Sequence, residues 1–201
     1  MGSQWGRDSV YIRAMKEGYR SRAAFKLQEI QERHQVIRGD DNVADLGAAP
    51  GSWLQVERSL TDGIVLGIDL SPIPPLDGVI TLTGDIEDPT IKAVVWGHMQ
   101  VVNVVVSDAS PKISGHRSYD QARAIGLGLA ALKFACTMLK PGGNFVVKSF
   151  QGEDFSDLLQ EVKKYFFSVR TYRCRASRKG SAEIYIIGKN FIGSHGSEGS
   201  V

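Results

Sequence analysis

The chain has 201 residues, of which 42% are hydrophobic and 23% are charged, which fits one globular domain with a core large enough to fold unaided. No apolar run approaches the ~20 residues of a membrane-spanning helix, and the first eight residues contain no apolar signal core. Two cysteines are too few for a disulfide framework, and the four histidines lack the spacing of metal ligands. Secreted, membrane-spanning and wholly disordered classes are excluded. We expect a cytoplasmic protein without a metal.

The net charge of +2 is distributed unevenly along the chain. Residues 1–38 carry a net charge of +4, residues 39–160 carry −7 and residues 161–201 carry +5. Two basic ends around an acidic middle favour a polyanion bound by the ends and a cationic or polar cofactor bound in the middle. Termini that are merely solvated are the alternative interpretation.

The N-terminal region has a helical pattern from Ser9 to His34, with a break at Gly18 and Ser21 as the expected N-cap of the second helix. Beyond it, Val- and Ile-rich strands alternate with helical segments, which is typical of a parallel sheet covered on both faces. The expected strands are Asn42–Leu46, Ile64–Asp69, Val79–Thr83, Val101–Ser107, Asn144–Phe150, Val169–Arg173 and Glu183–Gly188, and the expected helices are Ser52–Ser59, Pro89–Trp96, Tyr119–Leu139 and Asp154–Phe166.

These elements predict an α/β fold with a doubly wound, seven-stranded and mostly parallel sheet. The short connection Cys174–Ala182 predicts that the last two strands pair antiparallel, as a hairpin at one edge. We expect a single domain over residues 1–192, in which residues 1–38 form a basic helical extension. Residues 193–201 are rich in Gly and Ser and are expected to be a flexible tail.

A loop of small residues, Asp45-Leu46-Gly47-Ala48-Ala49-Pro50-Gly51, follows the first expected strand and leads into a helix. Small residues allow the backbone to approach a ligand, and the helix N-terminus offers free N–H groups. The spacing is neither the G-x-G-x-x-G of dinucleotide binding nor a Walker loop, which counts against a nicotinamide-dependent oxidoreductase. A tight turn without a ligand is the plain alternative. The candidate cofactor contacts here are Gly47, Ala48, Pro50, Gly51, Ser52 and Trp53.

Acidic residues end the next two strands, at Asp69-Leu70 and Asp85-Ile86. An acid at the offset of Asp69 can accept the two ribose hydroxyls of an adenosine. Asp85 can accept the adenine amino group, with Ile86 against the ring. A single acid at a strand end is usually a helix cap. Acids at the ends of three successive strands, here Asp45, Asp69 and Asp85, indicate a ligand site. Adenosine without pyrophosphate points to S-adenosylmethionine.

Charged residues also follow the later strands. Lys148 at the inner end of an apolar strand is unfavourable unless a carboxylate pairs with it, and Asp108 on the neighbouring strand can do so. A purely structural ion pair is the alternative. Glu183 lies at the start of the final strand. Lys26, taken alone, fits a lysine on a solvated helix face.

Together these residues resemble the FtsJ-like family of S-adenosylmethionine-dependent ribose 2′-O-methyltransferases, and within it the branch that methylates a uridine of large-subunit ribosomal RNA. The resemblance extends from about Trp5 to Phe191, and Ser52, where Gly is common, is a small departure. The matching segments are Tyr19–Leu27, Asp45–Trp53, Gly67–Asp69, Gly84–Ile86, Ser107–Asp108 and Pro141–Lys148.

The resemblance implies a Rossmann-like methyltransferase fold and S-adenosylmethionine as cofactor. The family's Lys-Asp-Lys-Glu tetrad falls on Lys26, Asp108, Lys148 and Glu183, and its cofactor contacts fall on Gly51, Trp53, Asp69, Asp85 and Asp108. Lys148 is then the base or the group that orients the ribose 2′-hydroxyl, and Asp108 is its partner. Lys26 positions the 2′-oxygen and Glu183 supports it. A neighbouring cation lowers a lysine pKa and a carboxylate opposes that shift, so base and orienting group both stay open.

The expected partner is RNA, bound by the basic ends of a monomer. A transfer-RNA ribose methyltransferase of the same family is the first alternative, and a non-catalytic RNA-binding assembly factor is the second. The candidate RNA contacts are Arg7, Arg13, Lys16, Arg20, Arg22, Arg175, Arg178 and Lys179.

Overall fold

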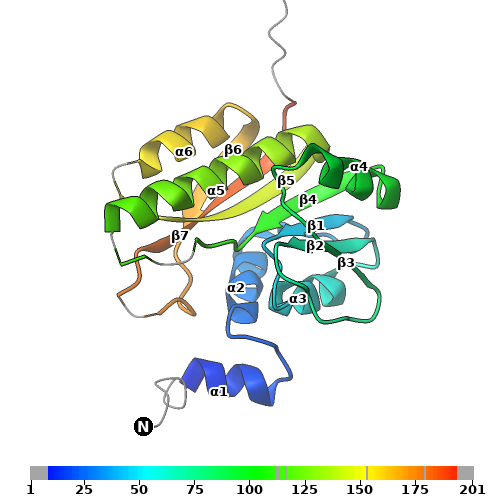
Figure 1. The fold of residues 1–201 in the computed structure, drawn as a ribbon, viewed down its shortest axis with the longest axis horizontal. Helices are drawn as coiled ribbons and strands as arrows, with labels where there is room; N and C mark the ends of the chain where they lie inside the picture. Colours follow the sequence, from blue (N-terminus) through cyan, green and yellow to red (C-terminus); the bar gives the residue numbers. More distant parts are fainter. Residues whose placement is uncertain (1–8, 112–113, 116, 153, 179, 194–201) are drawn as a thin grey trace, which may run out of the picture.

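The computed structural model of the chain describes residues 9–111, 114–115, 117–152, 154–178 and 180–193, and within them it forms one seven-stranded sheet (Figure 1). The strand order is β3-β2-β1-β4-β5-β7-β6. The strands are β1 Val43–Leu46, β2 Val65–Asp69, β3 Val79–Thr83, β4 Val102–Ser107, β5 Leu139–Phe150, β6 Phe166–Tyr172 and β7 Glu183–Phe191. The helices are α1 Ser9–Lys16, α2 Ala24–His34, α3 Ser52–Leu60, α4 Pro89–His98, α5 Arg117–Met138 and α6 Phe155–Lys163.

The doubly wound fold and its antiparallel hairpin are confirmed. Strands β1 to β5 pair in parallel, whereas β7 is antiparallel to both β5 and β6 and lies between them. Every residue of β1 and β4 is buried, as expected for central strands covered on both faces.

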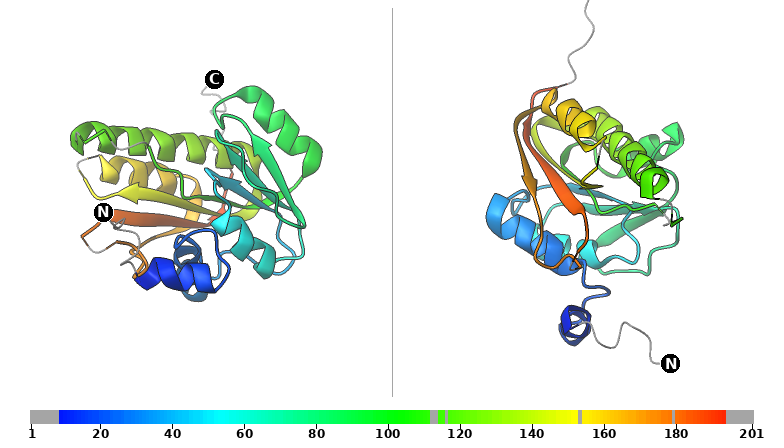
Figure 2. Two further views of the ribbon diagram at one scale, coloured as in Figure 1. Left: turned by 60° about the horizontal axis from the view of Figure 1, so that its bottom comes forward. Right: turned by 90° about the vertical axis from the view of Figure 1, so that its left-hand side faces the viewer.

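Two helical layers cover the sheet (Figures 1 and 2). Helices α4, α5 and α6 lie on one face and share a core with side chains such as Val105, Val147 and Ile186. Helices α2 and α3 lie on the other face, against alternate residues of the same strands, such as Val104, Val146 and Ile187. This alternation follows from the two-residue period of a strand. Helix α1 packs below α2 through a small cluster of Ala14, Phe25 and Ala176.

Several expected boundaries are wrong, and each error has a local cause. β5 begins at Leu139 instead of Asn144, because the Pro-Gly-Gly segment that reads as a turn continues the strand through an irregularity in its pairing with β4. β6 begins at Phe166, because Phe166 pairs with Phe191 at the end of a β7 longer than expected. Elsewhere the observed bounds lie within three residues of the expected ones, and those of β3 are as expected.

Ser21 is not the N-cap of α2. The N-cap position is Ala23, which makes no side-chain capping bond. The Ser21 hydroxyl accepts from the Ala23 N–H and is bonded to the Ser52 hydroxyl, so this side chain joins two elements instead of ending one. The break at Gly18 is confirmed, with φ of 80°. No helix within the described residues is long and apolar enough to cross a membrane.

Candidate active site

The site lies where the chain leaves the carboxyl ends of the central parallel strands. β1 and β4 are neighbours, and the chain continues from them toward opposite edges of the sheet, which creates the crevice in which open α/β sheets bind ligands. The register places Leu46, Ser107 and Val147 side by side, so the residue after each of them, namely Gly47, Asp108 and Lys148, emerges at the same level. The loops are in close contact here: a Cβ on Gly47 would lie 2.5 Å from that of Ala109.

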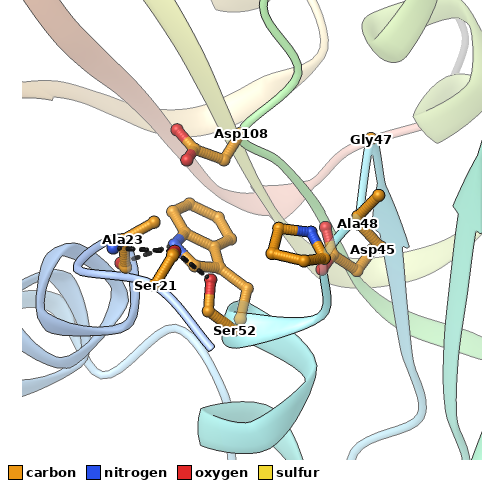
Figure 3. Close-up of a pocket in the computed structure, with 10 residues that line it drawn as sticks. Ser21, Ala23, Asp45, Gly47, Ala48, Ser52 and Asp108 are labelled. Atoms are coloured by element: carbon orange, nitrogen blue, oxygen red, sulfur yellow. Dashed lines mark hydrogen bonds between the residues drawn. The ribbon is translucent and has the colours of Figure 1, made fainter. Parts of the chain in front are cut away.

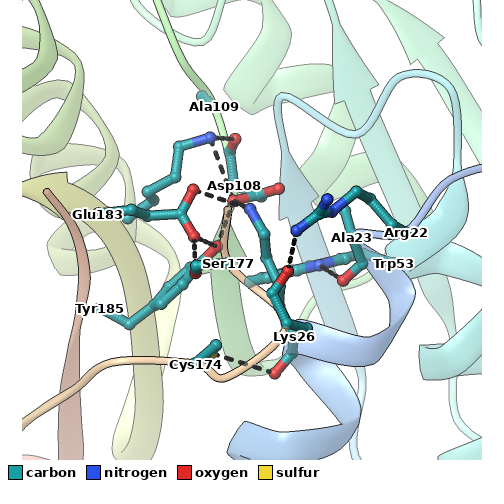
Figure 4. A network of polar contacts seen from close by, with 12 residues as sticks. Arg22, Ala23, Lys26, Trp53, Asp108, Ala109, Cys174, Ser177, Glu183 and Tyr185 are labelled. Carbon is teal, nitrogen blue, oxygen red and sulfur yellow. Dashed lines mark hydrogen bonds and ion pairs between the residues drawn. The ribbon is translucent and has the colours of Figure 1, made fainter. Parts of the chain in front are cut away.

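The structure brings the four expected tetrad residues together, and Figure 4 labels Lys26, Asp108 and Glu183 among them. We call Lys26, Asp108, Lys148 and Glu183 the tetrad cluster. The Lys148 Nζ lies 3.1 Å from the Asp108 Oδ1 and also donates to the Asp108 carbonyl. The Lys26 Nζ lies 3.7 Å from the same Oδ1 and 2.8 Å from the Glu183 Oε2. One carboxylate therefore contacts both ammonium groups, and the second carboxylate fixes one of them.

Lys26 does not lie on a solvated helix face. Its side chain is 11% exposed and reaches across to β7 from α2, which packs on the sheet through Leu27 and Ile30. The interpretation of Lys26 taken alone was wrong because the period of one helix cannot show which partner lies opposite. The tetrad pattern, by contrast, located this residue.

Sequence reasoning missed two polar side chains that support the cluster. The fully buried Tyr185 donates its hydroxyl to the Asp108 Oδ1 at 2.6 Å, and the Ser177 hydroxyl donates to the Glu183 Oε1. Burial and then the neighbouring carboxylates raise the pKa of Tyr185 well above 10, so its hydroxyl stays a donor. The sequence contained a signal for Tyr185, because it follows Glu183 by two positions on β7 and residues two apart on a strand share a face. Ser177, in an irregular loop, had none.

A pocket adjoins the cluster on the α3 side (Figure 3). Six of the candidate cofactor residues line it, and so do four residues that were not chosen as contacts. The expected lining residues are Gly47, Ala48, Pro50, Ser52, Trp53 and Asp108, and the additional ones are Ser21, Ala23, Asp45 and Ala49. The Trp53 indole N–H donates to the Ala23 carbonyl at 2.8 Å, which attaches the N-terminal segment to this pocket.

The Asp45 carboxyl group is the least satisfied polar group of the pocket. It is 1% exposed, and neither oxygen has a hydrogen-bond partner among the described residues. Burial, followed by the charges of Asp108 and Asp69, raises its pKa well above the usual range. Glu57 on α3 is also buried, and no hydrogen-bond partner for its carboxyl oxygens lies within the described part of the chain. Burial and then the charge of Asp45 raise the pKa of Glu57 as well. A buried acid in this state favours a cation beside it.

The remaining candidate cofactor residues lie outside the lining of this pocket. Asp69 accepts the N–H groups of Ala49 at 3.0 Å and Ser71 at 2.8 Å, and so connects the loops after β1 and β2. Asp85 accepts the N–H of Glu87. Gly51 lies beside the Arg20 guanidinium, Leu70 is exposed, and Ile86 packs partly against the main core.

The candidate RNA contacts fall into two groups. Arg13, Lys16, Arg175 and Arg178 are exposed. Arg20 and Arg22 instead direct their guanidinium groups to backbone carbonyls: Arg20 binds three, and Arg22 binds that of Ala176. Arg7 and Lys179 lie outside the described residues.

The strand order, together with a pocket at the point between β1 and β4 where that order reverses, defines a Rossmann-like methyltransferase fold. A solved structure described as a ribosomal RNA methyltransferase from Plasmodium falciparum matches it with a TM-score of 0.79 and 27% identity, over 87% of this chain and 100% of that one. The model of the FtsJ-like methyltransferases matches residues 19–191, and the chain belongs to that family.

Two archaeal relatives cover nearly the whole chain. The protein from Methanoculleus marisnigri is 66% identical over 195 residues, 96% of each chain, and the protein from Methanosphaerula palustris is 64% identical over 98% of this chain and 97% of its own. Both are named ribosomal RNA large subunit methyltransferase E.

Proposed function

We propose that this protein is an S-adenosylmethionine-dependent ribose 2′-O-methyltransferase that acts on a uridine of large-subunit ribosomal RNA in the cytoplasm. The observation that carries the proposal is the tetrad cluster, in which two largely buried lysines share one carboxylate beside the pocket. Relatives at 66% and 64% identity that are named for large-subunit ribosomal RNA support this substrate.

The pocket suits a small cationic cofactor. Asp45 offers a buried carboxylate without a partner among the described residues, and a cation beside it would lower its pKa and stabilise the ionised form. The loop of small residues leaves the backbone accessible. Gly47 and Gly51 have φ of 75° and 100°, backbone conformations that residues other than glycine rarely adopt. The residues present therefore fit S-adenosylmethionine, which, when bound, supplies an already activated methyl group.

The tetrad cluster can prepare a ribose hydroxyl for attack. The Lys148 Nζ is held against Asp108, where it can orient the hydroxyl oxygen or accept its proton. Lys26 is fixed by Glu183, and presents a second ammonium group that can position the same oxygen. Because Tyr185 and Ser177 hold the two carboxylates, the lysines are oriented before substrate arrives, and this preorganisation reduces the entropic part of the barrier.

A second cavity, of about 310 Å³, lies beside the cluster and gives the target nucleotide a place. Its walls include Pro111, Phe150 and Ala182, each within three residues of a tetrad member. The cavity walls are largely apolar, and nucleobases that leave a stack pack against aromatic side chains such as that of Phe150. We place the base of the target nucleotide here and the RNA backbone along the exposed Arg13, Lys16, Arg175 and Arg178.

The test is a map of 2′-O-methyl groups on ribosomal and transfer RNA from cells with and without the active protein. We expect one uridine of the large-subunit RNA to lose its methyl group when the gene is replaced by its Lys148→Ala variant. Loss of a transfer-RNA methyl group instead would favour the alternative substrate. An unchanged map from a protein that still binds RNA would favour a non-catalytic assembly factor.

A further inference from the structure

Within the chain between α1 and α2, residues 18–23 form one wall of the cofactor pocket. Ser21 and Ala23 line the pocket itself. Four hydrogen bonds attach this segment to α3. They join the Arg20 N–H to the Gln55 Oε1 (2.9 Å), the Gln55 Nε2 to the Gly18 carbonyl (2.9 Å), the Ser21 hydroxyl to that of Ser52 (2.7 Å) and the Trp53 Nε1 to the Ala23 carbonyl (2.8 Å).

The side chain of Arg20 extends this attachment to two loops. Its Nη1 donates to the carbonyls of Pro50 at 2.9 Å and Pro74 at 2.8 Å, and its Nη2 donates to that of Pro75 at 2.6 Å. Pro50 belongs to the loop between β1 and α3, which lines the pocket. Pro74 and Pro75 belong to the loop that begins after Asp69.

A guanidinium group suits this position because it carries five donors in one plane and never loses its charge. A proline has no backbone N–H to donate, and these three carbonyls lie outside the strands of the sheet. The contact is also close, since a Cβ on Gly51 would lie 2.5 Å from the Arg20 Nη1. Removal of Arg20 therefore removes one partner that both loops share and leaves Asp69 to connect them.

We propose that Arg20 is a positioning residue for the methyl donor, and that it holds the loops after β1 and β2 in the arrangement that binds the cofactor. The inference rests on the proposed function, because it takes S-adenosylmethionine to be the ligand of this pocket. It replaces the expectation that Arg20 binds RNA phosphate. Since Arg20 belongs to the basic N-terminal segment, any ligand that moves this segment must change cofactor affinity, and the cofactor must change the affinity for that ligand by the same factor.

Arg58 provides a matched control. It too donates to three backbone carbonyls, those of Thr61, Gly63 and Gly78. Gly78 lies at the far end of the same loop that Arg20 holds at Pro74 and Pro75, and neither Arg58 nor its three partners line the pocket. Loss of either arginine removes the same kind of bond, but loss of Arg58 leaves the pocket wall in place.

The experiment compares Arg20→Gln, Arg20→Lys and Arg58→Gln with the wild-type protein by calorimetric titration with S-adenosylmethionine and by thermal unfolding. We expect Arg20→Gln to raise the cofactor Kd about tenfold or more, because charge-assisted bonds are lost. Arg20→Lys, which keeps the charge but not the fork of donors, should also bind the cofactor more weakly than the wild-type protein. Arg58→Gln should lower the melting temperature and leave Kd within about twofold of wild type. At saturating cofactor, Arg20→Gln should recover most of kcat.

Two results would overturn the inference: unchanged cofactor affinity in the Arg20 variants, or equal weakening in the Arg58 variant. If Arg20→Gln does not fold, Arg20→Lys decides the matter by the same comparison. The salt dependence of RNA binding provides a second criterion, because a lost phosphate contact would reduce the log–log slope by about 0.7–0.9, whereas a positioning role leaves the slope unchanged. A wild-type protein that binds no S-adenosylmethionine would instead refute the proposed function, and the inference with it.

Discussion

Two groups of buried ionisable side chains lie side by side near the carboxyl ends of the central strands, and they differ in how they are satisfied. In the tetrad cluster, Asp108 and Glu183 both contact lysines and hydroxyl groups. Asp45 and Glu57 are at least as buried, yet their carboxyl oxygens have no hydrogen-bond partner among the described residues.

The difference indicates two uses of buried charge. A paired network is rigid and holds its groups for chemistry before the substrate binds. An unpaired carboxyl group lowers stability, so its position in the wall of a pocket is best explained by a ligand that satisfies it. The two groups should therefore respond in opposite ways when a charge is removed.

The largest effect should follow a break in the paired group. We expect Lys148→Ala to reduce the single-turnover rate of methyl transfer by about 10²–10⁴-fold, the usual range for a general acid or base, while cofactor binding persists. Lys148→Arg keeps the charge but cannot release its proton near neutral pH. If the wild-type rate rises with pH and the arginine variant loses its activity, Lys148 acts as a base. If the arginine variant keeps the rate, Lys148 acts as an orienting group.

Lys189→Ala is the control for this variant. Lys189 lies on β7, which pairs with the β5 strand of Lys148, but its Nζ donates to the carbonyl of His34 at 2.8 Å, away from the cluster. Its loss should affect stability and leave the rate unchanged. A Lys148→Ala protein with a near-normal rate would reduce Lys148 to a structural partner of Asp108.

The unpaired group should give the opposite pattern. We expect Asp45→Asn to weaken S-adenosylmethionine binding by about tenfold or more, as for a lost contact to a charged group, without loss of thermal stability, because no hydrogen bond within the described residues is broken. Calorimetry and thermal unfolding measure the two effects. Glu57→Gln, which removes the carboxyl group that does not line the pocket, should keep cofactor affinity. Equal affinity in Asp45→Asn and wild type would exclude Asp45 from the site.

The contrast between the two groups also marks what the sequence can predict. Asp108 and Lys148 were predictable because each stands at the carboxyl end of an apolar strand, and a parallel sheet brings such ends together. Glu183 stands at the start of an antiparallel strand, and its place in the cluster came from the family pattern. Lys26 needed a family pattern, because nothing in one helix shows what lies opposite it. The fold itself followed from Val- and Ile-rich strands and from one short connection.

What the sequence could not show is how single side chains satisfy one another. Arg20 reads as a phosphate contact because charge is all that the sequence displays; its three carbonyl partners come from prolines 30 to 55 positions away. Glu57 was not singled out in the sequence, and its burial follows from the packing of α3 on the sheet.

The unpaired carboxyl groups should also make stability depend on pH. The folded-state pKa values of Asp45 and Glu57 are raised, so between the unfolded and folded values the folded state holds more protons. The free energy of unfolding should therefore fall as pH rises above about 4. The fall is up to about 1.4 kcal/mol per pH unit for each group that is ionised in the unfolded state and still protonated in the folded state. Denaturant unfolding of Glu57→Gln across this range should give a shallower slope than wild type; an equal slope would mean that Glu57 does not titrate in this window.

The smallest effect should follow a change at the edge of the paired group. Tyr185→Phe keeps the buried ring and removes one hydroxyl donor from Asp108, a bond worth ~1.5 kcal/mol or somewhat more because its acceptor is charged. Both lysines still contact the same carboxylate, so we expect kcat to fall by no more than about tenfold. Tyr172→Phe is the matched control. The Tyr172 hydroxyl donates to the Glu29 Oε2 with a distance of 3.3 Å, and this bond lies outside the tetrad cluster. Both variants should lose stability in denaturant unfolding, but kcat should fall in Tyr185→Phe alone. Equal kcat in the two variants would show that the tyrosine hydroxyl holds the fold together and does not orient Asp108.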